Sequence, residues 1–343
     1  MANPNSQIPG LFRQIRANNF LQDLCHFIPS PGTASICILL YIFLGLLSVM
    51  TVCGNVLVII SITYFKQLHT PSNYLIISLA VADLLVGIVV FPMSMSFPLS
   101  SCLYYRDIFC KIRDSFDVIL SSTSILNLCC ISVDRYYAVC KPLIYRTKIN
   151  VHVVGIMILM SWGVPVLVAI GFVIAELNQE KCKENCFYDC EGSCLIDALI
   201  STTLACIFSF YIPVIIMLSI YLKIFLVAQS QVKTIHNATC QSKRSVAAVS
   251  KMERKATKTL AVVMGVFLLC WSPYFLCIIF QPLTYDATPI AAIETLNWLT
   301  LSNSMLNPFI YAFFYSWFRS AVRLMLSGKI FRDTEEVKSK LIA

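Results

Sequence analysis

Long apolar runs dominate the chain, and each has about the length that an α-helix needs to cross a bilayer. A helix of about 20 apolar residues spans the hydrocarbon core of a membrane. Several of the runs are continuously apolar rather than alternating, which favours helices over the strands of a barrel. The seven runs lie near 35–64, 72–98, 107–139, 151–175, 195–228, 256–281 and 288–315. The pattern predicts an all-α membrane protein built as a seven-transmembrane helix bundle.

The rest of the chain divides into two flanking segments. Residues 1–34 are expected to form an extracellular N-terminal segment, residues 35–315 the bundle, and residues 316–343 an amphipathic helix and cytoplasmic tail. The stretch 316–327, "SWFRSAVRLMLS", is amphipathic and predicts a short helix at the membrane surface. No positively charged segment followed by a small-residue cleavage site opens the chain, so the first run is expected to be a retained span.

Composition and charge agree with a membrane protein and set its orientation. The 343 residues are 58% hydrophobic and 13% charged, which excludes a soluble globular domain. Lys and Arg cluster after the third, fifth and seventh runs, and loops rich in them stay cytoplasmic. The N-terminus is therefore expected outside the cell. The net charge of +8 then belongs to the cytoplasmic, lipid-facing side, and no nucleic acid is expected as a partner. The opposite mouth is acidic and attracts cations.

Ionisable residues inside membrane spans are functional candidates, because burying a charge in lipid is costly. The second run holds Asp83, and the third holds Asp117 in its outer half and Asp134-Arg135-Tyr136 at its inner end. Asp117 and Arg135 are 18 residues apart, about 27 Å along a helix. Such a helix is suited to report the occupancy of an outer site to the cytoplasm. The seventh run places amides and a proline in "NSMLNPFIYAFFYSWF", residues 303–318.

These motifs, one or more in every span, resemble the rhodopsin-like G-protein-coupled receptors over essentially the whole chain. The matching residues are Asn55, Asp83, Asp134-Arg135-Tyr136, Trp162, Pro213, "CWSP" at 270–273 and "NPFIY" at 307–311. Asp117 with Trp271, Phe275 and Trp298 resembles the aminergic branch. Residues 303–318 match the fingerprint of the trace amine-associated receptors at every fixed position. The resemblance implies a plasma-membrane receptor for small amines. Its implied partners are a heterotrimeric G protein that raises cyclic AMP, stimulatory or olfactory in type, and arrestin; its implied setting is the olfactory neuron.

The expected ligand site centres on Asp117, whose carboxylate would form a charge-assisted hydrogen bond with an ammonium group. An aromatic floor and wall would add cation–π contacts; its residues are Trp271, Tyr274, Phe275 and Trp298. No basic residue is evident in the outer halves of the spans, which disfavours a purely structural role for Asp117. Leu301 stands where the aminergic pattern has a tyrosine, and Ser209 is the one fifth-span serine able to serve.

A second carboxylate near the mouth leaves the ligand class open. Asp114 lies one turn outward of Asp117, and Glu294 lies at the outer end of the seventh span. Both are candidates for contacting the second ammonium of a diamine or polyamine. The alternative, solvated charge at the mouth, is slightly favoured.

The resemblance also assigns roles to the polar residues deeper in the bundle. It implies that five residues line a water-filled pocket that holds a sodium ion as an allosteric modulator: Asp83, Ser124, Asn303, Ser304 and Asn307. The alternative is a set of structural polar contacts between helices. Pro308 and Tyr311 would form the hinge and switch of the inner seventh span. Arg135 would pair with Asp134 and reach Glu253, which holds the inactive state closed.

The cysteines divide between the outer side and the spans. The resemblance implies the disulfides Cys110–Cys190 and Cys25–Cys194, whereas Cys102, Cys182 and Cys186 have no assigned role. The cysteines within the spans are expected to act as small packing residues; they are Cys53, Cys129, Cys130, Cys206, Cys270 and Cys277.

Other classes of protein fit the sequence less well. No nucleophile–base pair, phosphate-binding glycine loop or metal-ligand cluster is present, so an enzyme is not expected. A transporter or channel often shows internal repeats, and the two halves of this chain show none. Within the receptor class, the alternatives are a serotonin- or histamine-like aminergic receptor and a constitutively active orphan receptor.

Overall fold

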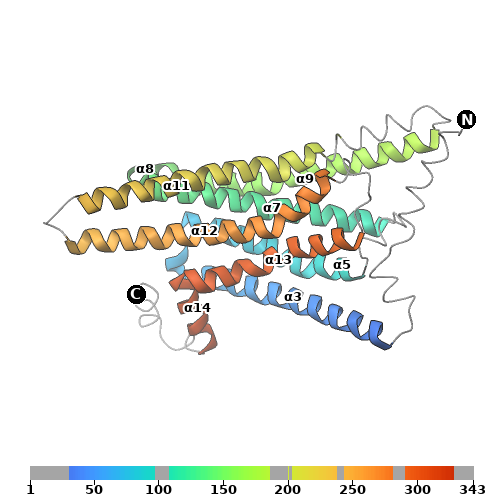
Figure 1. Cartoon of the computed structure of the whole chain (residues 1–343), viewed down its shortest axis with the longest axis horizontal. Coiled ribbons are helices and arrows are strands. Elements are labelled where there is room, and N and C mark those ends of the chain that lie inside the picture. Colours follow the sequence, from blue (N-terminus) through green and yellow to red (C-terminus); the bar gives the residue numbers. More distant parts are fainter. Residues whose placement is uncertain are drawn as a thin grey trace, which may run out of the picture.

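The chain folds into an elongated helical bundle (Figure 1). The structure is a computed structural model that describes residues 31–96, 108–185, 200, 203–237, 243–280 and 290–327. Within these residues all regular structure is helical, which confirms the all-α prediction. The long helices are α3 (Pro31–Tyr64), α4 (Pro71–Leu85) with its continuation α5 (Phe91–Ser96), α7 (Ile108–Cys140), α9 (Val151–Asn185), α11 (Ile212–Asn237), α12 (Lys243–Phe280) and α13 (Ile290–Phe314).

Six of these helical segments are long and apolar enough to cross a membrane. They are Ile38–Tyr64, Pro71–Ser96, Lys111–Cys140, Val151–Ile174, Thr203–Val227 and Ala261–Phe280. The seventh expected span corresponds to α13, which has 25 residues and packs against α3 and α12 in the same bundle. Its hydropathy is lower because it carries Asn297, Asn303, Ser304 and Asn307. All seven expected spans are therefore helices of one bundle.

Several helices extend past the ends that the apolar runs predicted. The helix α9 continues to Asn185, α11 continues to Asn237, and α12 begins at Lys243. The apolar run marks only the part of a helix that lies in lipid. The polar ends add turns without adding hydropathy.

Two wide π-helical turns, η4 (Val86–Val90) and η5 (Ile207–Tyr211), interrupt the second and fifth spans. Each lies just before a proline, Pro92 and Pro213 respectively. A proline lacks an amide hydrogen, and its ring clashes with the carbonyl four residues earlier. A π turn widens the helix at that carbonyl and relieves the clash. In η4 the carbonyl of Gly87 accepts a hydrogen bond from the Ser48 hydroxyl at 2.8 Å.

The short helix α14 (Ser316–Leu326) turns away from the bundle axis after α13 (Figure 1). Its buried residues Phe318, Ala321 and Leu324 pack in a cluster with Val58 of α3. Arg319 donates from Nη1 to the carbonyls of Ala312 and Phe313 at 3.1 and 2.9 Å, which caps the end of α13. The predicted amphipathic helix is therefore present and tied to the bundle.

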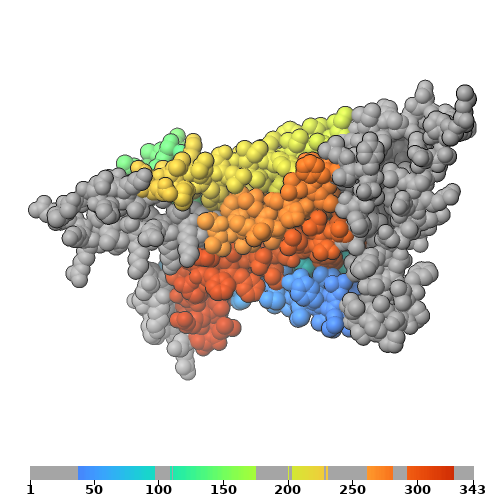
Figure 2. All heavy atoms as spheres, in the orientation of Figure 1, coloured from blue at the N-terminus to red at the C-terminus, as the bar shows by residue number. Residues whose placement is uncertain are grey.

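The outer surface of the bundle suits lipid rather than water. Figure 2 shows a continuous face over α11, α12, α13 and α3. Large apolar side chains of these helices are exposed, including Leu222 at 60%, Leu269 at 72% and Phe313 at 76%. Exposed apolar residues at this density mark a surface that another apolar phase covers.

Helices α3 and α13 approach closely at Gly54. A Cβ atom added at this glycine would lie 2.9 Å from Cβ and Cγ of Pro308. We expect Gly54→Val to destabilise the bundle by about 1–3 kcal/mol, because the proline ring cannot move without its helix. Thermal unfolding of the purified receptor should show a lower midpoint.

Gly45→Val is the matched control, because a Cβ atom added at Gly45 of the same helix meets no atom within 4 Å. Equal loss of stability in both variants would show that the close approach of α3 to Pro308 is not the reason why position 54 requires a glycine.

Candidate functional site

A fully buried carboxylate, Asp83 of α4, lies at the centre of the bundle. Ser124 of α7 donates to its Oδ1 at 2.9 Å, and Asn307 of α13 donates from Nδ2 to its Oδ2 at 2.7 Å. Ser304 of α13 also interacts favourably with this carboxylate. The family resemblance implied that these residues line one pocket, and the structure brings them together from three helices.

Two amides extend this polar cluster. Asn55 of α3 donates from Nδ2 to the carbonyls of Thr51 and Ser304, at 2.9 and 3.1 Å, so α3 is joined to α13. Asn303 is 1% exposed, and its Nδ2 has no hydrogen-bond partner within the described residues. A buried amide without a partner is costly unless a further polar species satisfies it.

The chemistry of this cluster suits a hard cation or ordered water. It offers one carboxylate, two hydroxyls and amide groups, and oxygen ligands are what hard cations prefer. Across the described part of the chain, no three His, Cys, Asp or Glu side chains gather as a metal site. A cation here would therefore be held by Asp83 with neutral oxygens around it.

Asp117 of α7 lies about two turns from Ser124 of this cluster, toward the N-terminal end of the helix, and is half-buried. Ser121, one turn along α7, donates to its Oδ1 at 3.0 Å. Tyr274 of α12 lies within electrostatic range of the carboxylate. Sequence analysis did not single out Ser121, although its i+4 spacing from Asp117 was a usable signal.

The aromatic residues expected around Asp117 fall into two groups. Trp271 and Phe275 of α12 have ring centroids 6.0 Å apart, and Phe275 stacks on Phe210 at 4.1 Å, with Tyr274 beside it. Trp298 of α13 instead packs on Phe91 at 5.7 Å, in a separate cluster that includes Leu301.

Two further residues of the expected ligand region offer no free hydrogen-bond donor to a ligand. Leu301 is 1% exposed and contributes only apolar packing where the aminergic pattern has a tyrosine. Ser209 lies in the π turn η5, and its hydroxyl donates to the carbonyl of Ala205 at 2.5 Å. To donate to a ligand, that hydroxyl would have to leave its own helix.

The expectation that no basic residue lies in the outer halves of the spans is wrong. Arg113 of α7 is 2% exposed, and its Nη2 and Nε lie 2.6 and 2.9 Å from Oδ1 of Asp114. Asp114 is thus an ion-paired carboxylate. Glu294 of α13 is 3% exposed and engaged in an interaction of its own. The sequence showed Arg113 among polar residues but not that its side chain turns into the bundle.

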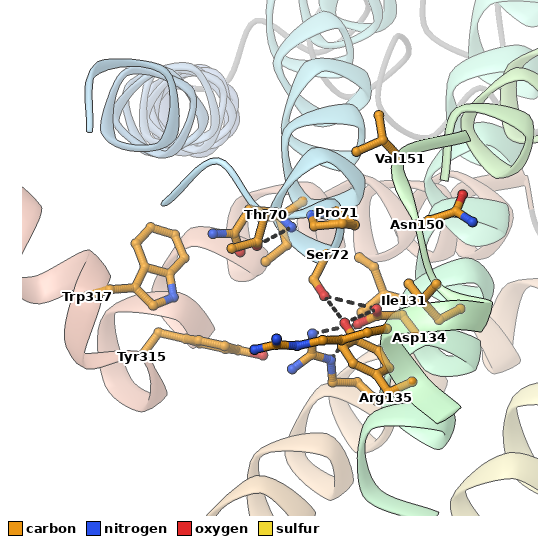
Figure 3. A pocket seen from close by; sticks show the side chains of 15 residues that line it. Thr70, Pro71, Ser72, Ile131, Asp134, Arg135, Asn150, Val151, Tyr315 and Trp317 are labelled. Carbon is orange, nitrogen blue, oxygen red and sulfur yellow. Dashed lines mark hydrogen bonds and ion pairs between the residues drawn. The ribbon is translucent and has the colours of Figure 1, made fainter. Parts of the chain in front are cut away.

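At the other end of α7, Asp134 is buried in a network drawn from three helices (Figure 3). Arg135 contacts its Oδ2 through Nε and Nη2, at 2.8 and 2.5 Å. Ser72 of α4 and the Tyr145 hydroxyl of α8 (Pro142–Lys148) donate to its Oδ1 at 2.9 and 2.8 Å. Ser72 and Tyr145 also contact each other at 2.7 Å.

Tyr145 is a functional candidate that sequence reasoning missed, because its position depends on how α8 folds. Burial raises the pKa of Tyr145, with smaller opposing effects from its hydrogen bond to Ser72 and from Arg135. The hydroxyl therefore keeps its proton at neutral pH and donates to Asp134.

This network borders a cavity of about 620 Å³ (Figure 3). Arg135 and Arg146 line it from one side, and Tyr315 and Trp317 line it from the region of α14. The side chain of Arg135 is 29% exposed and so remains accessible. The expected contact between Arg135 and Glu253 stays a prediction, because the structure describes the backbone of Glu253 in α12 but not its side chain.

The other residues expected to act in switching have defined neighbours. Pro308 packs against the backbone of α3 at Gly54. Tyr311 is buried, with ring centroids 5.8 Å from Tyr315 and 6.5 Å from Phe318. Tyr136 contacts Tyr137 edge to face at 5.5 Å.

The structure describes the cysteines of the spans but not the expected disulfides. The six cysteines expected to pack within the spans are all free of disulfides. The expected disulfides Cys110–Cys190 and Cys25–Cys194 stay predictions, because Cys25, Cys190 and Cys194 lie outside the described residues.

Comparison with known proteins agrees with this architecture. Residues 54–311 match the family model for the 7 transmembrane receptor (rhodopsin family). The chain is 46% identical over 310 residues to trace amine-associated receptor 1 of Macaca mulatta, covering 87% of this chain and 91% of the relative. It is 44% identical over 310 residues to trace amine-associated receptor 4 of Mus musculus, covering 89% of each. It is 43% identical over 308 residues to trace amine-associated receptor 9 of Homo sapiens, covering 88% of each.

The chain therefore belongs to the rhodopsin family of seven-transmembrane receptors and, within it, to the trace amine-associated receptors. The chain is thus a multi-pass plasma-membrane receptor that couples to G proteins. Members of this family are receptors and not enzymes. The resemblance seen in residues 303–318 is confirmed.

Removing the Tyr145 hydroxyl should weaken the network around Asp134. We expect Tyr145→Phe to lower the free energy of unfolding by about 1.5–3 kcal/mol, the worth of a hydrogen bond to a charged group. Ser72→Ala should have a smaller effect, and the double variant should cost less than the sum, since the two hydroxyls share Asp134. Thermal denaturation of the four purified receptors measures this coupling, and strictly additive losses would contradict a shared network.

Proposed function

We propose that this receptor senses small biogenic or trace amines from outside the cell and acts as an olfactory receptor. In this proposal it couples to a stimulatory or olfactory-type G protein that raises cyclic AMP, and arrestin binds the same cytoplasmic face. The N-terminus is extracellular and residues 316–343 are cytoplasmic. The observation that carries the proposal is the Asp117 carboxylate, which is half-buried, lies within electrostatic range of Tyr274 and accepts a hydrogen bond from Ser121 of its own helix.

The chemistry of Asp117 favours an ammonium ligand. An ionised carboxylate accepts about four hydrogen bonds, so Ser121 leaves capacity for further donors. An ammonium group supplies three donors and a positive charge, and a hydrogen bond between two charged groups is about twice as strong as a neutral one. The rings of Trp271, Tyr274 and Phe275 on α12 offer faces for cation–π contact. Trp298, which packs on Phe91, is the fourth aromatic residue of the proposed site. Ser209 serves as a secondary polar contact.

Helix α7 supports a route from the ligand to the G protein. Asp117, Ser124 and Asp134-Arg135 all lie on it, so the outer site, the Asp83 cluster and the inner network share one rigid element. A ligand that binds the active state better than the inactive state shifts the population toward it. In the active state Arg135 leaves Asp134 and Glu253, and Tyr136, Pro308 and Tyr311 rearrange around the cavity beside α14.

We assign the Asp83 cluster as a sodium site of the inactive state, with Ser124, Asn303, Ser304 and Asn307 as its other residues. The unpartnered Nδ2 of Asn303 is a hydrogen-bond donor, so it supports an ordered water in this cluster beside the cation rather than a direct contact with the cation. A bound cation would stabilise the closed arrangement of α4, α7 and α13, and its loss would accompany activation.

Sodium should therefore weaken agonist binding. We expect the agonist concentration for half-maximal binding to membranes to rise as NaCl replaces choline chloride at constant ionic strength. Asp83→Asn should abolish this dependence, because the neutral amide removes the charge that holds the cation. A potassium series serves as the ionic control, and an equal effect of potassium and sodium would exclude a sodium-selective site.

The amine proposal is tested by Asp117→Asn, which keeps the shape of the side chain and removes its charge. We expect the variant to lose at least about a hundredfold in potency toward every active amine, since each tenfold corresponds to about 1.4 kcal/mol. Cyclic AMP is measured in cells against a panel of monoamines, diamines and polyamines, with surface expression confirmed for both receptors. Asp117→Glu should retain part of the response.

An undiminished response in Asp117→Asn would exclude the salt-bridge mechanism. High cyclic AMP without any amine would favour a constitutively active receptor, and selective activation by serotonin or histamine would favour an aminergic receptor of that type.

A further inference from the structure

The pairing of Arg113 bears on how many positive charges a ligand can carry. This guanidinium is almost fully buried, and it holds Asp114 through two contacts of 2.6 and 2.9 Å. The Asp114 side chain is 52% exposed, so the pair has a buried cation and an exposed carboxylate. A ligand that enters past Asp114 therefore meets a carboxylate already neutralised from within.

Arg113 also acts on the ligand carboxylate itself. It precedes Asp117 by four residues on α7, which places the two side chains on one face of the helix, about 5–6 Å apart at their Cβ atoms. Its positive charge interacts favourably with Asp117. Asp114, Arg113 and Asp117 together carry a net charge of about −1 when all are ionised, which a single ammonium group balances.

The other carboxylate considered for a second ammonium is not open either. Glu294 of α13 is buried and already engaged. The described part of the pocket thus offers one carboxylate, Asp117, whose only hydrogen-bond donor there is a neighbour on its own helix.

We propose that Arg113 is a specificity-determining residue that restricts this receptor to amines with a single ammonium group and rejects diamines and polyamines. The inference rests on the proposed contact between Asp117 and the ammonium. A second ammonium one helical turn farther out, about 5.4 Å away, lies beside the guanidinium and is repelled by it. Taking Asp114 for itself would break the two contacts that this carboxylate makes with a buried guanidinium, which is unfavourable.

The test compares ligands that differ only in the second charge. Pentylamine is paired with 1,5-diaminopentane, hexylamine with 1,6-diaminohexane, and 2-phenylethylamine with 2-(4-aminomethylphenyl)ethylamine. The readout is the ratio of the two potencies in a cyclic AMP assay, because a ratio measured in the same cells does not depend on expression. The wild type should favour the monoamine of each active pair by at least about tenfold.

Arg113→Gln removes the charge and keeps a polar side chain. We expect it to shift the potency ratio toward the diamine by about tenfold or more, whereas Arg113→Lys should keep the wild-type ratio. Lys111→Gln is the matched control, since it removes another positive charge from the same turn of α7 and should leave the ratio unchanged. A purely structural role for Arg113 would lower both potencies together and leave their ratio intact, which would overturn the proposal.

Asp114→Asn, measured in the same potency assay, provides an independent test if Arg113→Gln does not reach the cell surface. Without Asp114 the charge of Arg113 competes with the ligand for Asp117, so monoamines and diamines should both lose potency. Loss confined to diamines would show that Asp114 binds their second ammonium and would overturn the proposal.

The assay separates this inference from the function on which it rests. A wild type that accepts diamines as well as monoamines, with both responses lost in Asp117→Asn, overturns the role of Arg113 alone. Responses that survive Asp117→Asn, or silence of the surface-expressed wild type toward every pair, overturn both.

Discussion

The absence of water from the bilayer core governs this structure. Polar side chains inside the bundle must satisfy one another, and the fully buried Asp83 shows how. Its two oxygens accept hydrogen bonds from α7 and α13, while Asn55 joins α3 to the backbone of α13. Four helices are therefore registered against one another around a single carboxylate. The region of Asp117 and the network around Asp134 both lie on helices that the contacts around Asp83 align.

The three aspartates that are buried or half-buried in the spans differ in where their partners lie. Asp83 and Asp134 receive hydrogen bonds from other helices, so moving a helix breaks bonds to a charge. Asp117 is held, among the described residues, by Ser121 of its own helix. Binding at Asp117 therefore need not disrupt a contact between helices. Asp83 and Asp134 thus join helices of the bundle, whereas Asp117 can still accept hydrogen bonds from a ligand.

The spans were predictable because apolar runs reflect the bilayer directly, and α13 was found despite the amides that lower its hydropathy. The residues around Asp83 were predictable from the resemblance to the rhodopsin-like receptors, and their gathering agrees with the cost of leaving polar groups unpaired in lipid. The pairing of Arg113 was not, since the sequence does not show which way a side chain at a helix end turns. Tyr145 was missed because its contact depends on the fold of α8, which no hydrophobic pattern encodes.

The two π turns change how positions on the second and fifth spans are compared with those of other helices. Each turn accommodates one residue more than an α-helical turn, so the outer part of the span is rotated by about 100° relative to an uninterrupted helix. A helical wheel drawn from the inner end of the fifth span therefore assigns residues beyond η5 to the wrong face. Each of η4 and η5 is therefore equivalent to one residue inserted within a helix rather than within a loop.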